Sequence, residues 1–139
     1  MTEEQKKNPE EWKEELETAI RAIPKAFRNE YSVRRTLQCH LYQCLKNMGY
    51  KVVADYMPPR IHDRPIDLIA VTGEREIAYA VCLDTLVTLA AVKSLSSFES
   101  ANKIIFTTGL VEKKVKESRF FLKPDIQHVH LQSPDKPPL

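Results

Sequence analysis

The chain opens with two segments in which apolar residues recur every three or four positions, the spacing of one face of a helix. The first segment follows Pro9, which suits the first turn of a helix, and stops at Pro24. The second begins near residue 30 and stops at Gly49, a residue that favours the end of a helix. Their apolar positions are Trp12, Leu16, Ala19, Ile20 and Ile23, then Val33, Leu37, Leu41, Cys44, Leu45 and Met48. The pattern therefore predicts two amphipathic helices.

Short apolar runs, bounded by proline, glycine and polar residues, predict the strands that follow. These runs cover residues 50–56, 65–71, 76–83, 103–107 and 126–131. The third run is apolar at nearly every position, which is typical of a central strand covered on both faces. Two more helices are expected over about residues 85–98 and 110–119, the former with Leu89, Val92, Leu95 and Phe98 as its inner positions.

This order of elements predicts one α/β domain, with a mixed sheet of about five strands flanked by helices. The domain is expected to cover residues 29–131, after an N-terminal amphipathic helix within residues 1–28 and before a mobile tail over 132–139. The length of 139 residues, with 42% hydrophobic and 29% charged residues, agrees with a single folded unit.

Charge is spread unevenly along the chain although the total is only +2. Basic minus acidic side chains give 6 − 8 = −2 over residues 1–30, 5 − 1 = +4 over 31–60, 3 − 6 = −3 over 61–100 and 7 − 4 = +3 over 101–139. The two basic blocks either meet on one face and attract a polyanion, or are neutralised by the acidic blocks within the fold.

No apolar run is long enough to span a membrane, and residues 1–7 lack the apolar core of a signal peptide. The three cysteines form no paired framework. A cytoplasmic protein with reduced thiols and no membrane partner is therefore expected.

The order of elements, together with three sequence features, resembles the PD-(D/E)xK restriction-endonuclease-like nucleases over roughly residues 29–131. The features are Glu30 at the head of a helix that carries Val33-Arg34-Arg35 and Leu37, the run Pro65-Ile66-Asp67, and the strand Tyr79-Ala80-Val81-Cys82-Leu83-Asp84. The resemblance implies that Asp67 is the metal-binding aspartate of the second strand. It also places the family's acidic-x-lysine pair at Cys82 and Asp84.

The chain departs from the family pattern at this pair, because Cys82 replaces the acidic residue and Asp84 replaces the lysine. Phosphodiester hydrolysis needs carboxylates that hold a divalent cation and a positive group near the developing charge. Lys93 on the following helix is the candidate for a migrated lysine. Without such a lysine, we expect no cleavage at the remnant positions, which are Glu30, Asp67, Cys82, Asp84 and Lys93. No cofactor is expected in that case. If the site survives, Mg²⁺ or Mn²⁺ would bind, with Asp67 and Asp84 as the candidate ligands.

The leading hypothesis is a catalytically degenerate nuclease-like domain that binds nucleic acid or assists a nucleic-acid-processing partner. Its candidate phosphate contacts are Arg34, Arg35, Arg64, Lys93, Lys113, Lys114 and Arg119. The basic run that includes Lys113 also holds Phe120 and Phe121, which either stack on bases or lie in the core. One alternative is a protein-protein or homodimerisation module that docks through Trp12, Leu16 and Ile20; another is a metal-dependent nuclease that uses Lys93.

Other chemistry-bearing residues favour ordinary structural roles. His128 and His130 share one face of a strand, and an exposed edge pair is expected there rather than a zinc site. Cys39, His40 and Cys44 lie on one helix without the short cysteine spacing of a zinc module, and Cys82 is expected to be a buried, inert thiol. Glycine occurs only at 49, 73 and 109, so a glycine-rich phosphate loop is excluded.

Overall fold

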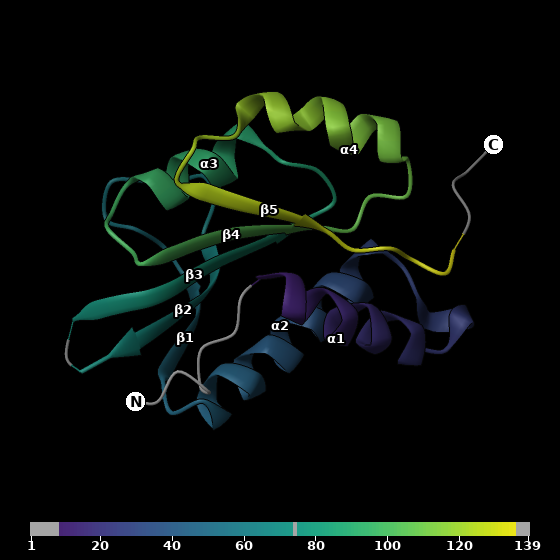
Figure 1. Ribbon diagram of the computed structural model, residues 1–139, viewed down its shortest axis with the longest axis horizontal. Coiled ribbons are helices and arrows are strands. Elements are labelled where there is room, and N and C mark those ends of the chain that lie inside the picture. Colours follow the sequence, from purple (N-terminus) through teal and green to yellow (C-terminus); the bar gives the residue numbers. More distant parts are fainter. Residues whose placement is uncertain (1–8, 74, 136–139) are drawn as a thin grey trace.

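The computed structural model describes residues 9–73 and 75–135, and its elements follow the predicted order (Figure 1). The helices are α1 (Pro9–Ala22), α2 (Glu30–Asn47), α3 (Leu89–Ser96) and α4 (Glu112–Ser118), with short 3-10 turns η2 (Lys25–Phe27) and η3 (Arg119–Phe121). The strands are β1 (Lys51–Tyr56), β2 (Ile66–Thr72), β3 (Glu76–Asp84), β4 (Asn102–Thr107) and β5 (Ile126–His130).

The five strands form one mixed sheet in the order β1-β2-β3-β4-β5. Strands β1, β2 and β3 are an antiparallel meander, and β4 and β5 continue the sheet parallel to β3. The predicted α/β fold with a mixed sheet is confirmed. Strand β3 is the central strand, and its run from Tyr79 to Leu83 is buried, as its apolar sequence predicts.

Two helices cover each face of the sheet, with α1 and α2 on one side and α3 and α4 on the other (Figure 1). Each face has its own buried cluster. Trp12 of α1, Leu37 of α2 and Leu68 of β2 belong to the first cluster, whereas Cys82 of β3 and Leu95 of α3 belong to the second.

Helix α2, which positions part of the candidate site, begins and ends at residues suited to those positions. The side chain of Asn29 accepts hydrogen bonds from the backbone N–H groups of Tyr31 and Ser32, and the Ser32 hydroxyl oxygen accepts one from the backbone N–H of Asn29. This capping box satisfies free donors of the first turn. Gly49 follows the helix at a φ of +98°, a left-handed conformation that glycine adopts without a steric penalty.

The apolar face of α1 is buried within this chain, which corrects the prediction of a docking surface there. Trp12, Leu16 and Ile20 are each exposed by 2% or less, and the Trp12 ring packs against Tyr79 with centroids 5.8 Å apart. Because the sheet already covers these side chains, a partner has no access to them. Leu89 also differs from its predicted inner position: it is 48% exposed, since α3 buries Ala91, Val92 and Leu95 instead.

The segment after β5, predicted to be a mobile tail, makes specific contacts over its described residues. Asp135 accepts hydrogen bonds from Arg28 at 3.0 and 3.1 Å, and the backbone N–H of Gln132 donates to Glu17 at 2.6 Å. Residues 136–139 lie outside the described part of the chain. Among the described helices, none combines the length and apolar character needed to cross a bilayer.

Candidate functional site

Asp67 is the buried centre of the candidate site, at the start of β2. Its side chain is 1% exposed and accepts hydrogen bonds from Arg34 at 2.7 Å, from Arg64 at 2.8 Å and from the backbone N–H of Leu83 at 2.6 Å. A buried carboxylate needs such partners. Arg34 and Arg64 together therefore balance the charge of Asp67.

Arg64 also joins Asp67 to Asp84, which ends β3. The Arg64 guanidinium lies 3.1 Å from Asp84 Oδ1, and its side chain is 10% exposed. Burial alone would lower the pKa of Arg64, but the carboxylates of Asp67 and Asp84 beside it raise that pKa above its ordinary value. Arg64 therefore stays charged, and its guanidinium is held by these two carboxylates; its role as a nucleic-acid contact stays a prediction.

Cys82 and Asp84 occupy the positions where the family resemblance expects the acidic-x-lysine pair. Cys82 is fully buried, and burial raises the pKa of its thiol to about 12, so the side chain is neutral. Burial likewise raises the pKa of Asp84, while Arg64 opposes that shift. At this site, the residues that could hold a divalent cation are Asp67 and Asp84, but both carboxylates already contact the Arg64 guanidinium.

The other two remnant positions do not join this ion cluster of Arg34, Arg64, Asp67 and Asp84. Glu30 is exposed and lines the same small cavity, of about 120 Å³, as Arg34 and Asp84. Lys93 is exposed on α3, whereas its neighbours Val92 and Ser94 are buried. The geometry thus places the lysine candidate in solvent rather than against the carboxylates.

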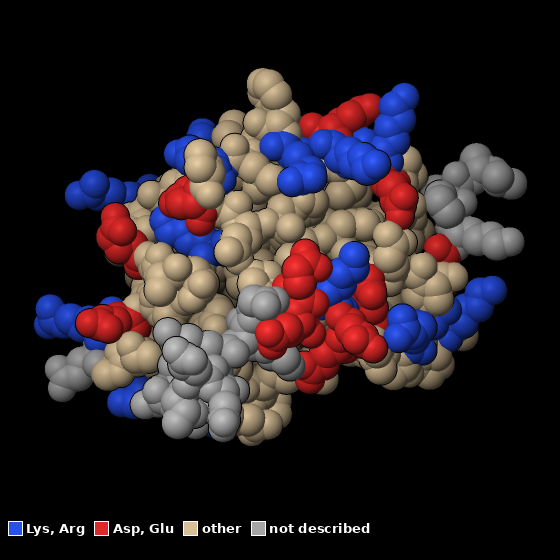
Figure 2. All heavy atoms as spheres, viewed as in Figure 1, with Lys and Arg blue, Asp and Glu red and all other residues tan. Residues whose placement is uncertain are grey.

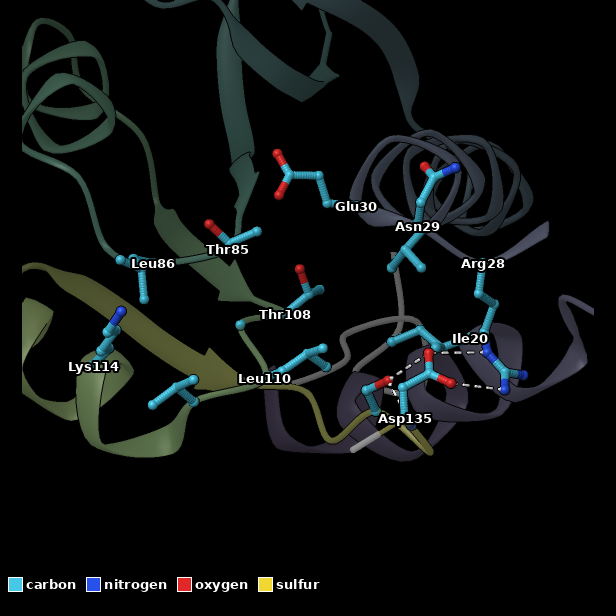
Figure 3. A pocket seen from close by; sticks show the side chains of 14 residues that line it. Ile20, Arg28, Asn29, Glu30, Thr85, Leu86, Thr108, Leu110, Lys114 and Asp135 are labelled. Carbon is cyan, nitrogen blue, oxygen red and sulfur yellow. Dashed lines mark hydrogen bonds and ion pairs between the residues drawn. The ribbon is translucent and has the colours of Figure 1, made fainter. Parts of the chain in front are cut away.

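A larger cavity, of about 460 Å³, adjoins the ion cluster where β3 and β4 end (Figure 3). Thr85 and Thr108 follow these two strands and line both cavities together with Glu30. Lys114 of α4 lines one side of the larger cavity, and the ion pair between Arg28 and Asp135 lines another. Ligands of open α/β sheets commonly bind beyond the carboxyl ends of the strands, where this cavity lies.

The remaining predicted phosphate contacts differ in their exposure. Arg34 is 40% exposed despite its ion pair with Asp67, and Arg35 is 62% exposed and pairs with Asp55 at 3.3 Å. Lys113, Lys114 and Arg119 are exposed on α4 and at the start of η3. In Figure 2, Lys and Arg side chains gather over α4, while Asp and Glu side chains gather over α1.

Phe120 and Phe121 lie in solvent, not in the core. Phe120 is 88% exposed and Phe121 is 40% exposed, and their rings meet edge to face with centroids 5.7 Å apart. Short 3-10 geometry after α4 turns this dipeptide outward, while Leu122 and Ile126 are the residues that turn toward the second core cluster. The two rings and the exposed cations Lys113, Lys114, Lys116, Arg119 and Lys123 form what we call the α4 surface.

His128 and His130 lie on one face of β5, as predicted, but they are half-buried rather than exposed. The hydroxyl of Thr107 on β4 lies 2.8 Å from His128 Nε2 and 2.9 Å from His130 Nδ1. Burial, together with Arg119 and His130, lowers the pKa of His128 to about 4. Burial also lowers the pKa of His130. Both imidazoles are therefore neutral at pH 7.

No family model, curated protein or solved structure matches this chain.

Proposed function

We propose that this chain is a catalytically inactive, nuclease-like domain that binds single-stranded nucleic acid through the α4 surface. The observation that carries the proposal is Phe120, an aromatic side chain 88% exposed beside Phe121 and among five exposed cations. Exposed aromatic rings among cations are typical of surfaces on which unpaired bases stack while the backbone contacts lysine and arginine.

Charge supports this location. Residues 112–123 carry five basic side chains, Lys113, Lys114, Lys116, Arg119 and Lys123, against two acidic ones, Glu112 and Glu117, for a local net charge of 5 − 2 = +3. Helix α1 instead presents exposed Glu10, Glu11 and Glu14, which repel a phosphate backbone. Nucleic acid would therefore lie over α4 and η3 and avoid α1.

The ion cluster supports the absence of cleavage. A divalent metal at Asp67 and Asp84 would have to displace the Arg64 guanidinium, which contacts both carboxylates at 2.8 and 3.1 Å. The guanidinium supplies the positive charge that makes the buried carboxylate of Asp67 and the partly buried one of Asp84 tolerable side by side. It provides neither a Lewis acid nor an activated water for hydrolysis.

Fluorescence anisotropy with labelled single-stranded DNA, single-stranded RNA, duplex and branched DNA, at two salt concentrations and with Mn²⁺ present, tests the proposal. We expect salt-sensitive binding that favours single strands, and intact probes on a gel. Phe120→Ala should weaken binding about 5- to 150-fold, the range for loss of one stacked base. Lys113→Ala should reduce the salt dependence by about 0.7 in the logarithmic slope, one phosphate contact on a single strand.

Phe27→Ala is the matched control, because Phe27 is 70% exposed in η2 and outside the α4 surface. It should leave affinity unchanged. Absence of binding at low salt, or equal losses for Phe120→Ala and Phe27→Ala, would contradict the nucleic-acid interface. Cleavage of any probe that depends on Asp67 would contradict the inactive centre.

A further inference from the structure

Three side chains of different chemistry meet where α1 packs on α2, away from the ion cluster and the α4 surface. Glu15 comes from α1, and His40 and Cys44 come from α2. Figure 1 shows these two helices, which pack against each other. His40 Nε2 lies 3.1 Å from Glu15 Oε1, and Cys44 Sγ lies 3.4 Å from the same oxygen. One nitrogen, one sulfur and one oxygen atom of these residues all lie within 4.8 Å of one another.

We propose that Glu15, His40 and Cys44 bind a zinc ion. A tetrahedral zinc site with bonds of about 2.0 Å to nitrogen and oxygen and about 2.3 Å to sulfur requires its ligand atoms to stand about 3.3 to 3.6 Å apart. The two separations from Glu15 Oε1, 3.1 and 3.4 Å, lie close to that range, and all three ligand atoms lie within 4.8 Å of one another. Imidazole, thiolate and carboxylate are the three side-chain ligands that zinc uses.

The backbone of α1 and α2 positions the three proposed ligands. His40 and Cys44 are one helical turn apart, so they lie on one face of α2, and this face meets α1 at Glu15. All three side chains are partly exposed, which leaves a path for the ion and room for water as the fourth ligand. Exposed Glu11 and Glu14 on α1, the helix that carries Glu15, create a negative potential that favours a cation.

The bound ion would fasten α1 to the rest of the fold. Deprotonated Cys44 and Glu15 would neutralise its two charges, and the hydrogen bonds that now join the three side chains would be replaced by metal bonds. Zinc should therefore stabilise the packing of α1 on α2. This site is independent of nucleic-acid binding, since it shares no residue with the α4 surface.

Cobalt(II), a spectroscopic substitute for zinc, tests the site in the full chain. We expect one equivalent to bind with the visible absorption of a tetrahedral ion and a thiolate charge-transfer band. Cys44→Ser should abolish the charge-transfer band. Cys39→Ser is the matched control, because Cys39 is exposed on the same helix next to His40 and residues adjacent in a helix do not face the same way; it should retain the band.

Zinc affinity measured by competition with a chromophoric chelator should fall at least about tenfold in His40→Gln and in Glu15→Gln. Circular dichroism of each variant shows whether it remains folded. If Cys44→Ser does not fold, Glu15→Gln still tests the site, because it keeps the shape of a partly exposed side chain. A missing charge-transfer band in the unmodified chain at saturating cobalt would overturn the proposal. Loss of the charge-transfer band in Cys39→Ser, with the band retained in Cys44→Ser, would also overturn the proposal.

Discussion

The guanidinium of Arg64 contacts the carboxylate of Asp84 at 3.1 Å, so a cation from the loop before β2 neutralises the acidic end of β3. In the family that the sequence resembles, the position of Asp84 belongs to a lysine. Here the positive charge comes from another segment and is held between two carboxylates. This arrangement supplies charge balance without freeing a group for catalysis.

Arg64→Ala should destabilise the domain strongly. The loss leaves Asp84 with an unpaired, partly buried charge and buried Asp67 with Arg34 as its remaining ion-pair partner, and breaking a buried ion pair typically costs about 3 to 5 kcal/mol. Urea unfolding followed by circular dichroism measures this. Arg75→Ala, at an exposed position in the β2–β3 turn, is the control and should change stability by less than about 0.5 kcal/mol. Equal midpoints for the two variants would show that the ion cluster contributes little.

The same variant should gain affinity for Mn²⁺. Without the guanidinium, Asp67 and Asp84 present oxygen ligands to a hard cation. Thermal unfolding with and without Mn²⁺ should show a rise in Tm for Arg64→Ala and a smaller one for the unmodified chain. Adding Asp67→Asn to Arg64→Ala should remove the gain. If Mn²⁺ raised the Tm of the unmodified chain as much as that of Arg64→Ala, Arg64 would not be what blocks the ion.

Acidification should weaken the fold through His128. Its pKa is about 4 in the folded chain, below the ordinary 6.5, so the unfolded chain binds the extra proton between these two values. Stability is therefore fully present above about pH 6.5 and declines as the pH falls toward 4, by about 1 to 2 kcal/mol because partial exposure screens the effect. The raised pKa of Asp84 acts in the opposite direction, since protonation favours its folded form.

Unfolding titrations of His128→Gln between pH 7 and 4 isolate the histidine. The variant should lose less stability across this window than the unmodified chain does. His62→Gln is the control, at an exposed position, and should follow the unmodified chain. Parallel curves for His128→Gln and the unmodified chain would exclude His128 as the cause.

Trp12→Ala should unfold the domain rather than separate a dimer. The indole is 2% exposed and contacts Tyr79, so its truncation leaves a core cavity and costs about 3 to 5 kcal/mol. Light scattering at several concentrations, combined with urea unfolding, separates the two effects. A lower unfolding midpoint with no change in mass is the expected result. A halved mass at an unchanged midpoint would restore α1 as a docking helix.

Periodicity predicted the order of helices and strands because each element is long enough to carry its own pattern. The central place of β3 followed from an apolar run that any solvent-facing strand would lack. Asp67 shows a second demand of this kind: a charge within an apolar strand requires a partner, and the structure provides Arg34 and Arg64. Such inferences need only the pattern of neighbouring residues in the chain, or one physical rule such as the need of a buried charge for a partner.

The direction in which side chains point at the end of a helix or strand was harder to predict. Phe120 and Phe121 follow α4 in a 3-10 turn, and hydrophobicity alone favours burying them. The meeting of Glu15 with His40 and Cys44 depends on how α1 crosses α2, which no local pattern records. The pairing of Arg64 with Asp84 likewise depends on the path of a loop, and the sequence offered Lys93 only as a candidate for a migrated lysine near these carboxylates.

The hydroxyl of Thr107, set between two imidazoles, has one hydrogen to give. When it donates to His128, the nitrogen of His130 that faces it has to carry a proton and donate in turn; when it donates to His130, the roles reverse. In either arrangement the two rings hold the same tautomer, both protonated on Nδ1 or both on Nε2, and the state of one ring is linked to that of the other through one oxygen atom. A proton or ligand that reaches one histidine from solvent would be registered at the second without any movement of the backbone.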